Sequence, residues 1–297
     1  MFDLSLIILS WNEVDVTLSC CESALVNEGT SLQRIVVDNG SDPAVVESLA
    51  TGLEDQGECL LIRSPSNGGY GAGMNMGATM AEGEVLVFAN NDLTFSQGAL
   101  DLLLSAVRDA GESAVCYPLV IDADGMSVHG GGYIPTLRRL AGSAIGLHIL
   151  LPRLFALNSN DPRFSEWTQG VCLAMSRTTY DRIGGFSEVT FMYSEDIRLG
   201  VALLESNGKL SLVPRASVIH LDDFSANKIW DERSKSARKS FEFVRVAAEI
   251  NRMRSPRLVG AFYWAICARR HVFHRSAATR GYLDGANSYL ASVGRAK

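Results

Sequence analysis

The chain lacks the marks of a secreted or membrane-spanning protein. Its six cysteines are scattered without any C-x-x-C pair, which argues against a disulfide framework or a zinc site and predicts reduced thiols in the cytoplasm. The first residues, MFDLSLIILSWNE, have no basic segment before the apolar run and no small-residue cleavage site, so they predict a buried strand and not a signal peptide. The longest late apolar run, at 258–268, has 11 residues, whereas about 20 are needed to cross a bilayer.

The composition is that of a globular protein with an uneven charge. Hydrophobic residues make up 47% and charged residues 20% of 297 residues, which fits one or two domains and excludes a disordered chain. Within a net charge of −6, residues 228–297 hold 15 Lys and Arg against 5 Asp and Glu, and the remainder holds 12 against 28. Such a split is typical of an acidic body with a basic appendage that meets nucleic acid, a membrane or a partner.

Strand and helix patterns alternate over the first 120 residues. Buried-strand runs occur at 4–10, 34–37, 59–62 and 85–89. Helical stretches separate or follow them at about 14–27, 44–55, 71–81 and 97–110. This order requires right-handed crossovers and a mostly parallel sheet. Polar residues and glycines follow the strand ends, at the edge where ligands bind in open α/β sheets.

The later part of the chain is less regular. Residues 118–165 predict a turn-rich region with a mobile loop. Further strands and helices are expected at 171–176, 178–184, 195 onward, 209–214 and 217–220, and everything beyond 228 is helical and basic. We therefore expect a catalytic domain at 1–227, with halves at about 1–120 and 165–225, followed by a helical extension at 228–297.

A glycine-rich segment separates the third strand from the next helix. It contains Gly68, Gly69, Tyr70 and Gly71, and Asn75 follows in the helix. Glycines at such a turn let the backbone approach a phosphate, and a helix amino terminus adds positive potential. A dinucleotide site would place this device after the first strand, so we favour a nucleotide sugar over NAD. A glycine-rich packing turn is the structural alternative.

Three groups of carboxylates or histidine also end strands or begin helices. Asp38 ends the second strand, where it could accept hydrogen bonds from a nucleobase or ribose, or could form an Asx-turn. Asp92 follows the fourth strand and could bind a divalent cation on a diphosphate, with His220 as a second ligand. The alternatives are a capping turn and a structural histidine. Glu195 and Asp196 begin a helix and could either cap it or supply a general base.

Together these segments resemble the inverting glycosyltransferases of family 2, in particular a rhamnosyltransferase-like branch. The matching segments follow the family's order over about residues 3–225, and they read LSWNE, VVDNGSD, SNGGYGAGMNMG, LVFANND, GVCLAMSR, GGFSEVTFMYSED and VPRASVIH. The resemblance implies an α/β protein of the GT-A fold, with a Rossmann-like mostly parallel sheet flanked by helices and a carboxyl-terminal helical extension.

The resemblance also implies a role for each matching position. Asp196 is the expected catalytic base, and Glu195, Trp167 and Gln169 would face the acceptor. Asp92 and His220 would hold Mg²⁺ or Mn²⁺. Asp38 would contact the pyrimidine base, and the rest of the nucleotide-sugar site would comprise Ser10, Asn12, Asn39, Gly68, Gly69, Tyr70, Gly71, Asn75, Asn90 and Asn91.

The chain departs from the family pattern in three places. Asn90 replaces the first carboxylate of the D-x-D motif, which implies a weak or dispensable metal. The VVDNGSD segment lacks the usual threonine. Arg198 and Ala202 stand where many relatives have an aspartate and an arginine, so acceptor binding or helix packing would differ.

The implied function is inverting transfer of L-rhamnose from dTDP-L-rhamnose to a hydroxyl of a bacterial cell-surface glycan or lipid-linked saccharide. A UDP-sugar donor stays open, because a contact from Asp38 does not distinguish thymine from uracil. A nucleotide-sugar-binding subunit without turnover is the non-enzymatic alternative. A nucleotidyltransferase ranks lower, because LSWNEVD is not a glycine-rich basic loop.

The basic extension has two interpretations. Arginines around an apolar run with Phe262, Tyr263 and Trp264 suit a helix that lies in an anionic membrane interface. The alternative is a helical cap docked on the catalytic domain or on a second subunit, as in a homodimer. Nucleic acid ranks last, because the rest of the chain is acidic. We expect a cytoplasmic protein, peripheral at the inner face of the cell membrane.

Overall fold

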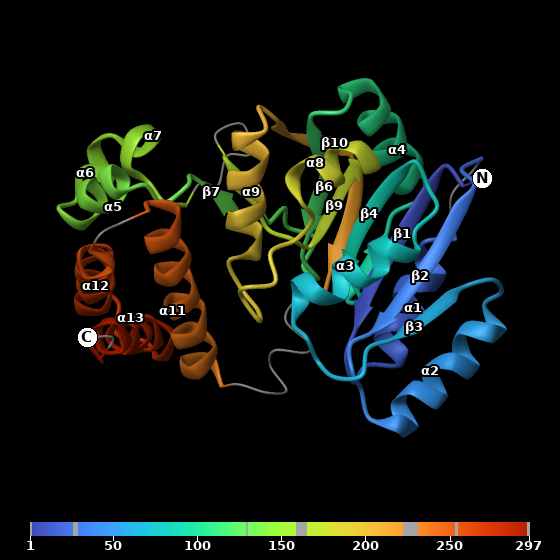
Figure 1. The fold of residues 1–297 in the computed structure, drawn as a ribbon, viewed down its shortest axis with the longest axis horizontal. Helices are drawn as coiled ribbons and strands as arrows, with labels where there is room; N and C mark the ends of the chain where they lie inside the picture. Colours follow the sequence, from blue (N-terminus) through green and yellow to red (C-terminus); the bar gives the residue numbers. More distant parts are fainter. Residues whose placement is uncertain are drawn as a thin grey trace.

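A computed structural model describes residues 2–25, 29–128, 130–158, 165–221, 231–252 and 255–295. It consists of a central sheet covered by helices on both faces, and of a helical part at one end of the sheet (Figure 1). The strands of the sheet lie in the order β3-β2-β1-β4-β9-β6-β10-β5.

The sheet is mostly parallel, as predicted. Its strands are β1 (Leu4–Ser10), β2 (Leu32–Asp38), β3 (Leu60–Arg63), β4 (Val85–Asn90), β5 (Leu93–Phe95), β6 (Ala114–Ile121), β9 (Cys172–Ser176) and β10 (Lys209–His220). Strand β9 runs antiparallel to β4 and β6, and β5 runs antiparallel to β10. The remaining neighbours are parallel. Strands β5 and β6 were not expected from the sequence.

The two faces of the sheet are covered by different helices. Along β1, Leu6 and Ile8 point into one buried cluster and Ile7 points into the other. Helices α1 (Asp15–Ser23), α2 (Pro43–Asp55) and α4 (Ala99–Ala110) complete the first cluster. Helices α3 (Tyr70–Met80), α8 (Arg177–Ile183) and α9 (Glu195–Glu205) complete the second. Burial on both faces explains why the strands read as continuous apolar runs.

The expectation of an irregular segment at 118–165 was wrong in part. The described residues there include α5 (Leu137–Ala144), α6 (Leu147–Leu150) and α7 (Pro152–Phe155), together with β7 (Gly131–Gly132), which pairs with β8 (Trp167–Thr168). Thr136 caps α5 by accepting a hydrogen bond from the backbone N–H of Arg139. The helix is short, and its buried face packs on residues more than a hundred positions later in the chain, so local patterns hide it.

Three helices form the carboxyl-terminal part, namely α11 (Glu232–Ile250), α12 (Pro256–Phe273) and α13 (Ala277–Arg295). Their apolar side chains share a buried cluster with Leu140 of α5, and Val259, Tyr263 and Ile266 of the apolar run lie inside it. The buried side chains of the run therefore lie inside a helical cap, which was the alternative interpretation of this segment, whereas Leu258 and Trp264 are exposed. Among the described residues, none of the helices combines the length and apolarity that a membrane span requires.

The helical cap is docked on the catalytic part through α9. Ile134, Ile197 and Val246 form one buried cluster between α9 and α11, and Arg198 of α9 pairs with Glu249 of α11. Residues 137–155 thus pack with the extension although they precede β9 in the chain. The boundary at 227 stays a prediction.

Candidate active site

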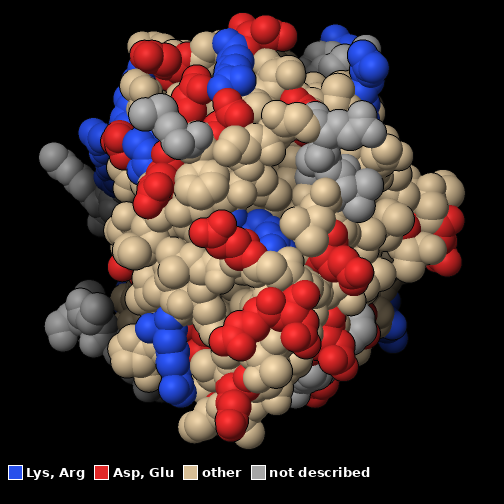
Figure 2. Space-filling model, turned by 90° about the vertical axis from the view of Figure 1, so that its right-hand side faces the viewer, with Lys and Arg blue, Asp and Glu red and all other residues tan. Residues whose placement is uncertain are grey.

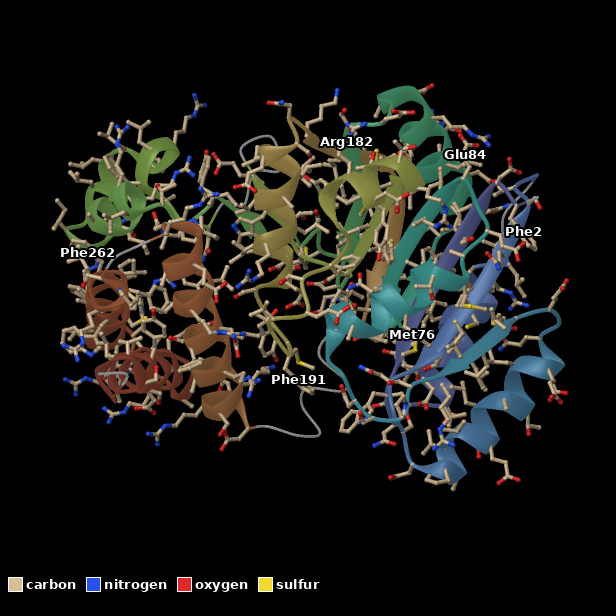
Figure 3. All side chains as sticks on the ribbon, viewed as in Figure 1. Phe2, Met76, Glu84, Arg182, Phe191 and Phe262 are labelled. Atoms are coloured by element: carbon tan, nitrogen blue, oxygen red, sulfur yellow. The ribbon has the colours of Figure 1, made fainter. Side chains whose placement is uncertain are left out.

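The carboxyl ends of the parallel strands bring the predicted residues to one edge of the sheet. Ser10 lies opposite Asp38, and Leu9 lies opposite Asn90, in adjacent strands. Phe2, Glu84 and Arg182 mark the other end of the sheet, whereas Phe191 lies at the end where these strands finish (Figure 3). The loop that contains Phe191 leads directly into Glu195 and Asp196 at the start of α9, so the candidate base Asp196 lies towards the same edge.

Asp38 is fully buried and is held in a turn. Its carboxylate oxygens accept hydrogen bonds from the backbone N–H of Ser41 at 3.1 and 3.3 Å, and one lies 3.8 Å from Nε of Arg63. Asn12 accepts a bond from the backbone N–H of Asp42, and the hydroxyl of Ser10 donates to the carbonyl of Glu13. These side chains fix the loops of the predicted nucleoside site.

The glycine-rich segment is tightly packed against the loop that precedes α9. A Cβ on Gly69 would collide with the carbonyl of Phe191, and one on Gly71 would collide with the carbonyl of Ser187. Gly69 also has φ of +87°, which favours glycine. The amide of Asn39 accepts a bond from the backbone N–H of Gly68 and donates to the carbonyl of Gly69. Close packing thus accounts for these glycines, and a ligand contact stays a prediction.

Asn75 and Tyr70 hold the same loop from α3. The amide of Asn75 donates to the carbonyl of Phe186 and to Glu188, and it accepts from the hydroxyl of Tyr180. The hydroxyl of Tyr70 donates to the carbonyl of Gly170 at 2.5 Å. Burial, and then the charge of Glu195, raises the pKa of Tyr70. Tyr70 therefore connects α3 to Gly170, which precedes β9.

The predicted metal ligands meet. Asp92 lies beyond the end of β4, and His220 ends β10 opposite Leu93 of β5. Oδ1 of Asp92 lies 3.2 Å from Nε2 of His220, and both side chains are largely buried. Asn91 next to them donates a hydrogen bond to Thr17. Within the described ranges, no group of three or more His, Cys, Asp or Glu residues surrounds a common point.

The carboxylate pair stands on a strained turn at the start of α9. Tyr193 and Ser194 have φ of +74° and +69°, which is uncommon for residues other than glycine. Burial raises the pKa of both Glu195 and Asp196, and the charge of Asp196 raises that of Glu195 further. Asp196 accepts a bond from the backbone N–H of Ile197 at 2.8 Å, and this bond and the charge of Lys239 favour its ionised form.

Helix α11 contributes side chains that the sequence did not suggest. Nζ of Lys239 lies 4.9 Å from the ring centroid of Tyr193, and the guanidinium of Arg238 lies 5.7 Å from that of Phe191. Arg245 donates to the carbonyl of Val189 and pairs with the buried Glu242. A basic tail gives no local signal for this contact, because it arises only when α11 docks on the loop.

Trp167 and Gln169 occupy different surroundings. Trp167 packs against Ile134 and Ile197 at the junction with α11, and its indole N–H is buried without a hydrogen-bond partner among the described residues. Gln169 is exposed and lines a cavity of about 360 Å³ together with Tyr117 and Cys172. Their contact with an acceptor stays a prediction.

This sheet and its edge have the architecture of the GT-A fold, which is that of glycosyltransferases. Residues 5–134 match the model of glycosyl transferase family 2, and the chain is similar to the rhamnosyltransferases among its relatives. Two relatives, from Mycobacterium tuberculosis strains CDC 1551 / Oshkosh and H37Rv, are named N-acetylglucosaminyl-diphospho-decaprenol L-rhamnosyltransferase. Each is 27% identical over 210 residues, a match that covers 63% of this chain and 65% of the relative, so slightly less than two thirds of the relatives' length is matched.

Solved structures share the fold at low sequence identity. The mannosyltransferase PcManGT from Pyrobaculum calidifontis, in complex with GDP-Man and Mn²⁺, aligns with a TM-score of 0.64 and 14% identity, over 98% of this chain and 87% of that one. GalNAc-T7 with UDP, GalNAc and Mn²⁺ aligns with a TM-score of 0.61 and 16% identity, over 84% of this chain and 48% of that one. Both comparisons support the expected GT-A architecture.

Proposed function

We propose that the protein transfers L-rhamnose from dTDP-L-rhamnose, with inversion, to a hydroxyl of a lipid-linked saccharide. The observation that carries this proposal is the edge of the sheet at which Asp92 and His220 lie 3.2 Å apart and the loop that precedes Glu195 and Asp196 packs against the glycine-rich segment. The rhamnosyltransferase name of the relatives supports the choice of sugar, and the diphospho-decaprenol in that name supports a lipid-linked acceptor.

The carboxylate pair supplies the proton chemistry. Asp196 is the better base, because the backbone N–H of Ile197 and the charge of Lys239 stabilise its ionised form. Its carboxylate takes the proton of the acceptor hydroxyl while that oxygen bonds to the anomeric carbon. The bond from the anomeric carbon to the diphosphate oxygen breaks in the same step, and the nucleoside diphosphate leaves with the electron pair.

The edge residues fit a divalent cation. Neighbouring ligands of an octahedral Mg²⁺ or Mn²⁺, with bonds of about 2.1 Å, lie about 3 Å apart, and the 3.2 Å between Asp92 and His220 matches that spacing. A cation bound there would offset the negative charge of the diphosphate. Binding of Mn²⁺, followed by electron paramagnetic resonance, should be lost in Asp92→Asn and weakened in His220→Gln; equal Mn²⁺ binding by wild type and both variants would contradict the assignment.

The donor is tested by comparing nucleotides. A ligand at 100 times its Kd stabilises a folded protein by about 2.7 kcal/mol, and at equal concentration the ligand with the lower Kd stabilises it more. Since we propose a dTDP-sugar donor, dTDP should raise the melting temperature more than UDP. Incubation with dTDP-L-rhamnose and an N-acetylglucosaminyl-diphospholipid should give a disaccharide lipid by mass spectrometry. A larger shift with UDP, together with transfer from a UDP-sugar only, would replace the rhamnose assignment. Binding without hydrolysis or transfer would favour a non-catalytic subunit.

A further inference from the structure

Large apolar side chains gather on the exposed surface of the helical part. Seven of them lie in two short segments, 145–154 and 272–273, and they are Ile145, Ile149, Leu150, Leu151, Leu154, Val272 and Phe273. Leu150 is 77% exposed and Phe273 is 74% exposed. Soluble monomers rarely expose apolar side chains in such groups without an interaction partner.

The two segments belong to neighbouring elements. Leu140 of α5 packs in one buried cluster with Tyr263 and Ile266 of α12. Nε2 of His148 in α6 lies 3.3 Å from the guanidinium of Arg269 in α12. Arg269 precedes Phe273 by one turn of that helix. Helices α5, α6 and α7 lie next to α12 at the end of the molecule farthest from β3 (Figure 1).

The chain segments that carry these side chains have charge of one sign. Residues 135–157 and 250–283 contain ten arginines and neither Asp nor Glu. Arg270 and Arg275 are exposed beside Phe273. On the opposite end of the molecule, acidic side chains predominate over basic ones (Figure 2). The molecule is therefore polarised, with its apolar side chains at the cationic end.

We propose that segments 145–154 and 272–273, with the surrounding arginines, dock the enzyme on an anionic lipid bilayer. The apolar side chains enter the boundary between headgroups and acyl chains, and the arginines contact lipid phosphates, the arrangement that holds interfacial helices on membranes. The apolar run at 258–268 contributes less to such a surface, because Val259, Tyr263 and Ile266 are buried and its exposed side chains Leu258 and Trp264 are only 41% and 40% exposed. The docking surface does not depend on which donor is bound, and it rests on the proposed function only in bringing the site to a lipid-linked acceptor.

The direct test is flotation of the full chain with vesicles, without donor or acceptor. Wild-type protein should float with phosphatidylcholine vesicles that contain phosphatidylglycerol, and less with phosphatidylcholine alone. Ile149→Glu with Leu150→Glu should abolish flotation, while Met80→Glu on α3, which also replaces an exposed apolar side chain, should leave it unchanged. Arg270→Gln with Arg275→Gln should lower the partition coefficient about 30-fold, since each arginine near the surface contributes about 1 kcal/mol.

Three outcomes would overturn the proposal. The first is that the wild type floats equally with both kinds of vesicle. The second is that the variant with Ile149→Glu and Leu150→Glu floats like the wild type. The third is that no protein binds vesicles and this variant instead loses a dimer that the wild type forms. Circular dichroism of each variant confirms that it is folded. Sugar transfer to a water-soluble acceptor without vesicle binding would reject the docking surface alone, and vesicle binding without transfer from any donor would reject the proposed function alone.

Discussion

Glu195 and Asp196 are adjacent in the chain but differ in what stabilises their charge. Asp196 accepts a backbone hydrogen bond and lies near Lys239, whereas Oε2 of Glu195 is buried without a hydrogen-bond partner among the described residues. Environments that separate the pKa values of two carboxyl groups assign one as the base and leave the other protonated. We infer that Asp196 carries the charge near neutral pH and that Glu195 keeps its proton.

Replacement of the two carboxyl groups by amides separates their roles. Asp196→Asn should lower kcat by about 10²–10⁴-fold, because positioned base catalysis is lost, and should leave donor affinity unchanged in calorimetry. Glu195→Gln is the matched control and should keep most of the turnover. Wild-type kcat in the Asp196→Asn enzyme would show that another group takes the proton.

The pH dependence of kcat follows from the same pair. Because burial raises the pKa of Asp196, turnover should fall with decreasing pH at a value above the ordinary aspartate pKa of about 3.9. Because Glu195 keeps its proton in this pH range, Glu195→Gln exchanges one neutral group for another and should leave this limb in place. A limb that moves to lower pH in that variant would show that Glu195 is ionised when Asp196 titrates.

The same shifts predict a cost in stability. Since the folded-state pKa of each carboxyl group is raised, the folded state loses stability as pH rises from the unfolded pKa through the folded one. Glu195→Gln should therefore raise the melting temperature at pH 8 more than at pH 4. The opposite order would mean that the ionised carboxylate is stabilised in the fold.

At the level of elements, the amino terminus of α3 and the loop before α9 support each other. Gly69 and Gly98 both have positive φ, but only Gly69 faces a carbonyl where a Cβ would be, while a Cβ on Gly98 would meet no atom within 4 Å. Gly98→Ala should cost about 1 kcal/mol of unfolding free energy, and Gly69→Ala about 2–4 kcal/mol, because close packing adds to the backbone strain. Urea denaturation measures both values; equal losses would exclude the steric contribution.

The contact of α11 with the same loop gives a second prediction. Glu242 is 4% exposed and pairs with Arg245, which in turn donates to the carbonyl of Val189. Glu242→Gln should lower the unfolding free energy by about 1–3 kcal/mol, because it leaves a buried hydrogen-bonding group poorly satisfied. Arg233→Gln removes an exposed ion pair with Asp284 and should cost less than about 1 kcal/mol. If the two variants lost equal stability, the Glu242 contact would be no more than a surface pair.

For the whole molecule, β1, β2 and β4 could be predicted because burial on both faces gives continuous apolar runs, and the partly exposed edge strand β3 could be predicted from its short apolar run. His220 could be named as a candidate partner of Asp92 because it ends an apolar strand, and the family resemblance favoured that pairing, although no local spacing connects the ends of β4 and β10. Helix α5 and the docking of α11 could not be predicted, because Leu140 and Val246 acquire their apolar environment only from distant parts of the chain. The basic tail was correctly predicted to be helical, but Val259, Tyr263 and Ile266 of its apolar run pack in the core between the carboxyl-terminal helices.

This packing also bears on the domain boundary. A chain that ends at residue 227 would expose Ile134 and Ile197 and would leave Arg198 without Glu249. We expect it to aggregate or to unfold without cooperativity in a thermal melt. A cooperative melt with a wild-type midpoint would instead support residues 1–227 as an independent domain.

We propose that Asp196 acts as the base of an inverting sugar transfer at the edge marked by Asp92 and His220. The decisive experiment is nuclear magnetic resonance of the product formed from dTDP-L-rhamnose and a diphospholipid-linked acceptor. We predict a new glycosidic bond whose anomeric configuration is opposite to that of the donor, and no such product from the Asp196→Asn enzyme. Retained configuration, or an equal yield of inverted product from that variant, would contradict the account.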